Sequence, residues 1–452
     1  MKKKLFSLIS LAVVGSLAFG SAAFAESING SGATFPQSFQ SGATAAFNAA
    51  TGHTATYANP GGGSSKGKAD FKANLTDFGG TDSSVTAAQA AAFDWVYIPY
   101  VGGAISVAYR LDELSGVTLS LTPTTINGIF GGTISKWNDP SIVNDLKTNP
   151  VYANSKKKSE IKGVSALIAT PAAGSAEVTV SAIPNVFKTL KGKSIEIVDA
   201  KSKKVLKKGT FSAAETAVSF GAKEGVNYSV RVSGKEVANF AKTIVTLPDK
   251  DIIVVYRSDG SGTSNNFCNF MRQVANSDWV QNDAFTSCIP GGSSKVASYG
   301  SRYQGQSGSA NVSNYVADTN GSIGYTEVSF VLDATRAAKG MKSANVRNAA
   351  GKFVAPTAAA TSAFLSGSTV DDKGFVTFDY KQTTNTAAYP VVAITYALAK
   401  TAKSGKNDVV KAYYDWILKT YAPANAEALA YAPLTGGLKT AALAQVAKIS
   451  SK

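Results

Sequence analysis

Three short turns rich in glycine and hydroxyl side chains each lead into a stretch with helical hydrophobic spacing. They read GSGATFP (residues 30–36), GGGSSKG (61–67) and SDGSGTS (258–264). The start of a helix leaves backbone N–H groups unpaired and carries a partial positive charge, so it favours an anion. Glycine lets the backbone come close to a ligand, and Ser or Thr hydroxyls add donors. A single turn of this kind is usually a helix cap, but three in one chain predict an oxyanion site.

The second turn also resembles a nucleotide-binding loop. From Gly62 the chain reads G-x-x-x-x-G-K, but the next residue is Ala69 instead of the Ser or Thr whose hydroxyl would hold Mg²⁺. The missing hydroxyl disfavours a nucleotide, and the residues of this turn alone leave open which anion it would hold.

The N-terminal residues are typical of a secretory signal peptide. Three lysines are followed by an apolar run and by the A-x-A pattern Ala23-Phe24-Ala25. We predict cleavage after Ala25; a membrane anchor is the alternative, but the run is short for a span. No cysteine lies near the cleavage site, so we expect no lipid anchor. The protein is then expected outside the cytoplasm, where ATP is scarce, which disfavours an NTPase.

The composition describes an ordinary globular protein with room for two or three domains. Of its 452 residues, 44% are apolar and 17% are charged. The only histidine is His53, so a Cys/His metal site or a histidine-based catalytic triad is not expected. Cys268 and Cys288 could form a disulfide in an oxidising compartment, or could remain two buried thiols.

Most of the chain alternates strand-like and helix-like segments. Phe39, Ala43 and Phe47 recur at helical spacing, and so do Phe267, Met271 and Val274. Strand-like runs and one more amphipathic helix predict α/β lobes with mostly parallel sheets. The runs are WVYIPYVGGAISVAYRL (95–111), DIIVVY (251–256) and YPVVAITYALA (389–399), and the helix is NDVVKAYYDWILKTY (407–421).

Residues 150–246 follow a different pattern. Segments such as EVTVSAI and YSVRVSG alternate apolar and polar residues between turn clusters, which predicts an inserted all-β sandwich of immunoglobulin or fibronectin type III character. The excess positive charge is concentrated there, with 17 Lys and Arg against 8 Asp and Glu between 151 and 250. These lysines form either a solvated face or a surface for an anionic polymer. The few aromatic residues fit core alternation, so nucleic acid is not an expected partner.

Several motifs occur in the order found in one known family: SGATFPQSF, GGSSKG, DFGGTDSS, ISKWND, YRSDGSGTS and SIGYTEV. The chain resembles the phosphate-binding proteins of bacterial phosphate ABC importers, and its N-terminus also resembles the related DING proteins. The resemblance covers the mature chain except for about residues 150–246. In that family a KWDD…NP segment is followed closely by LP, whereas here 96 residues lie between Pro150 and Leu247, which gives independent support for the position of the insert.

The resemblance implies which residues contact inorganic phosphate. Main-chain N–H groups and hydroxyls of the three turns would donate to its oxygens, and a guanidinium would offer two parallel donors. Asp259 either orients that guanidinium or is a plain surface residue. Lys66 stands where the family often has glycine, and either adds positive field or points to water. The implied contacts are Thr34, Phe35, Ser64, Asp82, Arg257, Ser261, Gly262 and Thr263.

Asp82 carries the argument for specificity. A carboxylate repels an anion unless the ligand brings a proton to donate, as hydrogen phosphate does and sulfate does not. Sites built around a substrate proton reject analogues that lack it by about 10⁴-fold or more. Arsenate has the same protons and shape, so this logic does not exclude it. The alternative is that Asp82 merely caps the turn GTDSS.

The resemblance also implies the architecture and the function. It predicts a two-lobed type II periplasmic binding protein that closes on phosphate and docks on an inner-membrane permease, with no cofactor and no enzymatic activity. One rival hypothesis is a phosphohydrolase, which would need a metal cluster or an activated nucleophile; the single histidine and the lack of a metal-ligand pattern count against it. The other is a surface adhesion protein that works through the inserted domain; retention of all eight contact residues counts against it. The predicted lobes are 26–108 plus 329–452 and 109–149 plus 247–328, with 150–246 inserted.

Overall fold

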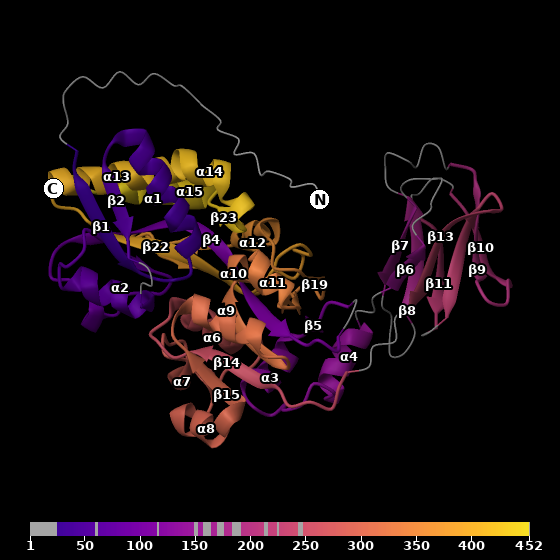
Figure 1. Ribbon diagram of the computed structural model, residues 1–452. Coiled ribbons are helices and arrows are strands. Elements are labelled where there is room, and N and C mark those ends of the chain that lie inside the picture. Colours follow the sequence, from indigo (N-terminus) through magenta and orange to yellow (C-terminus); the bar gives the residue numbers. More distant parts are fainter. Residues whose placement is uncertain are drawn as a thin grey trace, which may run out of the picture.

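The structure is a computed structural model (Figure 1). The segment predicted as a signal peptide lies outside the described residues, apart from Ala25. In the described part of the chain no helix is both long and apolar enough to span a bilayer. The described residues are 25–58, 62–114, 117–148, 152–156, 164–169, 176–182, 191–211, 216–223, 226–242 and 247–451.

A ten-stranded sheet forms the centre of the molecule, in the order β15-β14-β16-β4-β22-β3-β1-β2, with β17 and β23 also paired to β4. The strands β1, β2 and β3 are parallel to one another, and so are β14, β15 and β16. The bounds are β1 Ser27–Gly32, β2 Thr54–Tyr57, β3 Phe78–Thr81, β4 Trp95–Arg110, β14 Ile253–Arg257, β15 Tyr303–Gln306, β16 Ser322–Glu327, β17 Lys342–Ser343, β22 Val392–Lys400 and β23 Tyr431–Pro433.

Strand β4 connects the two lobes. From Trp95 to Ala104 it pairs with β22, and from Ile105 to Arg110 it pairs with β16. Strands β4 and β22 run antiparallel to all their described neighbours, so the sheet is mixed. The prediction of mostly parallel sheets was therefore wrong, because β22 runs opposite to β3 of one βα unit and β4 runs opposite to β16 of the other. The sequence-based lobe boundaries stay predictions.

Helices cover the sheet (Figure 1). Two of them bury residues at the helical spacing seen in the sequence. Helix α1 (Gln37–Thr51) buries Phe39, Ala43 and Phe47, as predicted. Helix α6 (Gly262–Val274) buries Phe267 and Met271, but Val274 is 37% exposed because it is the last helical residue. The other helices are α2 Gly63–Lys72, α3 Pro123–Phe130, α4 Pro140–Thr148, α7 Phe285–Cys288, α8 Gly292–Ser298, α9 Gly308–Asp318, α10 Val328–Leu332, α11 Ala334–Ala338, α12 Ala358–Leu365, α13 Gly405–Trp416, α14 Ala422–Asn425 and α15 Gly436–Ala447, with a π-helical turn at Ile417–Tyr421.

Short ladders and turns complete the two lobes. Strand β18 (Asn345–Arg347) lies between β5 (Ser120–Leu121) and β19 (Phe353–Val354). Strands β20 and β21 form a separate pair, Thr369–Val370 with Val376–Thr377. The 3₁₀ turns are Ala87–Gln89, Gly300–Arg302 and Glu427–Leu429.

The described residues of the predicted insert contain strands and no helix. They form a five-stranded sheet, β10-β9-β12-β13-β6, and a three-stranded sheet, β11-β8-β7, and no described strand among them pairs with the central sheet. Phe220 of one sheet packs edge-on against Tyr228 of the other, with ring centroids 5.1 Å apart. The boundaries 150–246 and the immunoglobulin-like assignment stay predictions. The strands are β6 Tyr152–Lys156, β7 Val164–Ala169, β8 Ala176–Ala182, β9 Ser194–Asp199, β10 Val205–Thr210, β11 Thr216–Ala222, β12 Asn227–Val232 and β13 Lys235–Lys242.

Candidate anion-binding site

The first turn joins β1 to α1 and is held by close backbone packing. A Cβ at Gly32 would lie 2.1 Å from the carbonyl oxygen of Gly80, so only glycine fits where the turn begins. Thr34 and Phe35 follow and are both buried. The Thr34 hydroxyl lies 3.0 Å from the Ser309 hydroxyl and accepts the Ser309 N–H at 3.2 Å.

The second turn starts α2 and places Ser64 against the end of β3. Ser64 is fully buried, and its Oγ accepts the N–H of Asp82 at 3.0 Å. Lys66 is 52% exposed and pairs with Asp70 one turn along the same helix, so it points to solvent. Lys68, which the sequence-based reasoning passed over, is buried instead.

The third turn runs from the end of β14 to the start of α6 and orients a guanidinium. Arg257 is buried, and Asp259 accepts its Nε at 2.6 Å and its Nη2 at 2.5 Å. Asp259 also accepts the N–H of Gly308 at 3.0 Å, which fixes the carboxylate in turn. Burial alone would raise the pKa of Asp259, but the hydrogen bonds and charge of Arg257 lower it overall. Of the two interpretations of Asp259, the geometry supports an orienting role.

The remaining residues of this turn supply hydroxyls and N–H groups. Ser261 is the N-cap of α6, and its Oγ accepts the N–H of Ser264 at 3.1 Å. Thr263 is buried, and its Oγ1 has no hydrogen-bond partner among the described residues. Buried hydroxyls are normally satisfied, so Thr263 is suited to donate to a ligand.

Asp82 is a buried carboxyl at the end of β3. Its Oδ1 accepts the hydroxyl of Thr395 at 2.8 Å, and its Oδ2 lies 3.4 Å from the hydroxyl of Ser64. Burial raises the pKa of Asp82 to about 7, although the hydrogen bond from Thr395 and the charge of Arg257 oppose this shift. The carboxyl therefore exchanges a proton near neutral pH.

The turns of the two lobes meet at Gly262. A Cβ there would lie 2.4 Å from the Ser64 Oγ and 2.7 Å from the Asp82 Cβ. The side-chain amide of Asn266 donates to the carbonyl of Asp82 at 2.6 Å, so α6 contacts the end of β3 directly. All the residues implied by the family resemblance are buried around this junction: Thr34, Phe35, Ser64, Asp82, Arg257, Ser261, Gly262 and Thr263.

A charged contact between the lobes lies beside this junction. The Nζ of Lys68 is 2.7 Å from the Oδ2 of Asp283, and the Ser65 hydroxyl donates to the same oxygen at 2.9 Å. The Ser65 N–H also donates to the carbonyl of Gly260 at 3.0 Å. Helix α2 is thus joined to the loop that precedes α7 and to the turn that precedes α6.

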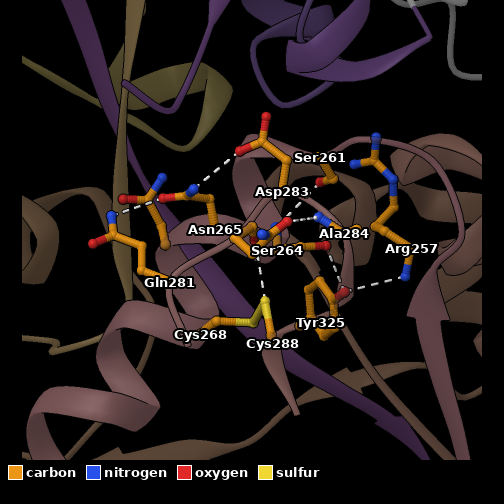
Figure 2. The surroundings of a disulfide bond; sticks show 12 residues. Arg257, Ser261, Ser264, Asn265, Cys268, Gln281, Asp283, Ala284, Cys288 and Tyr325 are labelled. Atoms are coloured by element: carbon orange, nitrogen blue, oxygen red, sulfur yellow. Dashed lines mark hydrogen bonds between the residues drawn. A yellow bond between two sulfur atoms is a disulfide. The ribbon is translucent and has the colours of Figure 1, made fainter. Parts of the chain in front are cut away.

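A disulfide holds the loop that carries Asp283 (Figure 2). It links Cys268 in α6 to Cys288 at the end of α7, with the two Cα atoms 5.9 Å apart. Asn265 donates to Asp283 at 3.0 Å, and the Asp283 carbonyl accepts the N–H of Ser261 at 2.9 Å. The disulfide therefore lies next to both the anion turn and the interlobe contact.

Four contributors were missed in the sequence: Ser309, Thr395, Lys68 and Asp283. Ser309 Oγ lies 3.3 Å from Arg257 Nη1 and also contacts Thr34, so it links two turns that are far apart in sequence. Lys68 could have been found from the second lysine of GGSSKGKA. Ser309 also had a signal, since it lies in the glycine- and serine-rich turn GQSGS (305–309) at the start of α9, whereas Thr395 and Asp283 carry no local signal.

No metal site is indicated by the described residues. None of them form a group of three or more His, Cys, Asp or Glu side chains able to hold a metal ion. A separate cavity of about 530 Å³ lies between α12 and α15 and has no charged lining residue. The arrangement at the junction supplies helix-start N–H groups, hydroxyls, one guanidinium and one carboxyl, which together suit a tetrahedral oxyanion that carries a proton.

Comparison with known proteins identifies the class. Residues 18–420 match the family model that describes a PBP superfamily domain, and the chain belongs to this superfamily. This confirms the resemblance inferred from the motifs. Among solved structures, a DING protein superposes with a TM-score of 0.56 at 17% identity, over 92% of this chain and 93% of that one. The fold is that of a two-lobed type II binding protein.

Two relatives by sequence and one solved structure are named as phosphate-binding proteins. The phosphate-binding protein PstS of Haemophilus influenzae is 24% identical over 438 residues, covering 96% of this chain and 95% of the relative. PstS of Xylella fastidiosa strain 9a5c is 24% identical over 415 residues, covering 91% and 82%. A high affinity periplasmic phosphate-binding protein, PfluDING, was solved with phosphate bound; it has a TM-score of 0.55 and 19% identity over 92% of this chain and 93% of that one.

Proposed function

We propose that this protein captures inorganic phosphate between its lobes outside the cytoplasm and delivers it to the permease of an ABC transporter. One observation carries the proposal: a buried guanidinium, buried hydroxyls and one buried carboxyl meet where the two lobes touch. The names of the PstS relatives and the phosphate-bound neighbour support it.

The proposed contacts come from both lobes. Thr34, Phe35 and Ser64 would donate from one lobe, and Arg257 with the Ser261–Thr263 turn from the other. Only the closed state satisfies both sets at once, so phosphate would shift the population towards closure. Removing the ligand from water would strengthen each hydrogen bond.

Asp82 would provide the discrimination. As an ionised carboxylate it accepts a hydrogen bond from the P–OH group of hydrogen phosphate, while sulfate leaves it facing a negative oxygen without a bridging proton. A buried, unbridged pair of negative groups costs several kcal/mol. We therefore propose that sulfate binds far more weakly than phosphate at pH 8, where Asp82 is largely ionised in the ligand-free protein.

The remaining parts of the proposal concern location and turnover. We propose a periplasmic protein released by cleavage after Ala25 and carrying no lipid anchor. We also propose binding without catalysis; the relatives are named as binding proteins, and neither the phosphohydrolase nor the adhesion hypothesis is favoured by them. Absence of turnover of a chromogenic phosphate ester tests this point.

Calorimetric titration tests the central proposal. Refolded, ligand-stripped protein is titrated with phosphate and then with sulfate, comparing wild type, Asp82→Ala and Asp372→Ala, the last an exposed carboxylate that serves as control. We expect tight one-to-one phosphate binding in wild type and control, and reduced discrimination in Asp82→Ala. Absence of heat with phosphate, or equal affinity for sulfate in wild type, would refute the proposal.

A further inference from the structure

The two oxygens of Asp82 have different surroundings. Oδ1 accepts a hydrogen bond of 2.8 Å from the hydroxyl of Thr395, a fully buried residue. Oδ2 has only a long 3.4 Å contact with the Ser64 hydroxyl, whose oxygen already accepts the N–H of Asp82. Oδ2 is therefore the oxygen with capacity for a further partner.

Strand β22 brings Thr395 to this position. Tyr396 pairs with Thr81, the last residue of β3, so Asp82 falls beside Thr395. The ladder between β22 and β4 shifts register between Thr395 and Tyr396. Such bulges redirect side chains and are frequent next to binding sites. The hydroxyl thus approaches the carboxyl from the strand that lies between β3 and β4.

The charged and titratable groups around Asp82 come from several elements. Arg257 favours the ionised carboxyl, and Asp283 opposes it. Among the influences that hold the pKa of Asp82 down, the hydrogen bond from Thr395 is the largest. Burial raises the pKa of four tyrosines of the first lobe, and the charge of Asp82 adds to each shift: Tyr57, Tyr100, Tyr396 and Tyr431.

We propose that Thr395 is a positioning residue that sets the anion specificity of the site: by holding Oδ1 it leaves Oδ2 to accept the proton of the ligand. The inference rests on the proposed function and deepens it. Thr395 needs no contact with the anion for this role. Its hydroxyl also stabilises the ionised carboxyl, the form that rejects sulfate.

The proposal makes a specific statement about sulfate and pH. Sulfate has no proton, so it binds well only when Asp82 itself is protonated. Its affinity is then constant below the pKa of Asp82 in the ligand-free protein and falls about tenfold per pH unit above it. Loss of the hydrogen bond to the ionised carboxyl raises this pKa, and with it the pH above which the sulfate affinity falls, by about one to two pH units.

Three variants test this statement. Thr395→Val removes the hydroxyl at nearly constant shape, and Thr395→Ser keeps a hydroxyl. Thr361→Val is the matched control, because Thr361 is equally buried but its hydroxyl donates to the carbonyl of Thr357 at 2.9 Å. Sulfate and phosphate affinities are measured by calorimetry between about pH 5 and about pH 9, with thermal unfolding recorded for each variant.

The proposal expects a change in Thr395→Val alone. The pH above which its sulfate affinity falls moves up by about one to two pH units, and discrimination between phosphate and sulfate near pH 8 falls by about five- to tenfold. Thr395→Ser and Thr361→Val keep the wild-type profile. If the valine variant does not fold, Thr395→Ala removes the same hydroxyl with a smaller side chain.

Two results would overturn the inference. One is a folded Thr395→Val or Thr395→Ala protein whose sulfate affinity depends on pH as in wild type. The other is an equal shift in Thr395→Ser, because the hydroxyl would then not be the cause. Failure of the proposed function is seen separately, as wild-type protein that does not bind phosphate at all.

Discussion

The ion pair between Lys68 and Asp283 should control how tightly the lobes close on the ligand. Its two side chains are 2% and 12% exposed and come from α2 and from the loop before α7, on opposite lobes. Lys68 also donates to the Ser83 hydroxyl and to the Ser84 carbonyl, both at 3.1 Å. Asp283→Asn removes the negative charge but keeps the size of the side chain.

The size of the effect follows from burial of the uncompensated lysine. Removing one partner of a buried, hydrogen-bonded charge pair at an interface costs about 2–5 kcal/mol. In the open state Lys68 can be hydrated, so this cost falls on the closed state and appears in binding. A central value of about 3 kcal/mol corresponds to roughly a hundredfold weaker phosphate binding. The unfolding temperature of the ligand-free protein should change little.

Phosphate titration of Asp283→Asn and Lys68→Met measures this effect. Lys66→Met is the control, since Lys66 lies on the same helix but forms an exposed pair with Asp70, worth at most about 0.5 kcal/mol. The double variant should lose much less than the sum of the two single losses. An affinity of Asp283→Asn within about threefold of wild type, well short of the hundredfold expectation, would refute the reasoning.

Three further predictions concern pH, the disulfide and the insert. Burial raises the pKa of Asp82 to about 7 and of Glu327 to about 8. Folding therefore takes up protons at pH values between the ordinary carboxyl pKa and these raised values, so ligand-free protein should unfold at a lower temperature at pH 8 than at pH 5. Asp82→Asn should reduce that difference in unfolding temperature, and an unchanged difference would contradict the raised pKa of Asp82. Replacing Cys268 and Cys288 by Ala opens a loop with a sequence separation of 20 and should cost about 3 kcal/mol of unfolding free energy in chemical denaturation, with weaker phosphate binding because Asp283 lies in that loop. Replacing residues 150–246 by a short flexible linker should leave phosphate affinity within about twofold, since no described strand of the insert pairs with the central sheet; a large loss would show that the insert supports the lobes.

The local patterns predicted the elements well. Helical spacing located α1, α6 and α13, and continuous apolar runs located β4, β14 and β22. The glycine turns pointed to helix starts, because the signals for a helix start and a tight turn lie within a few residues. What the local patterns missed was strand direction, since the pairing of β4 and β22 depends on contacts about 300 residues apart.

The sequence by itself determined which residues can hold an oxyanion. The Gly-rich turns and their hydroxyls indicate an anion site through residue type and spacing, and the family resemblance implies that Arg257 and Asp82 belong to it. Only the tertiary structure decided which partners hold these side chains in position and shift their pKa values. Thr395 reaches Asp82 from a strand 313 positions away, Ser309 joins Thr34 to Arg257, and Lys68 meets Asp283 across the lobes. A hydroxyl or a charge has no local signature for such roles, because its effect depends on the burial and the partners that folding supplies.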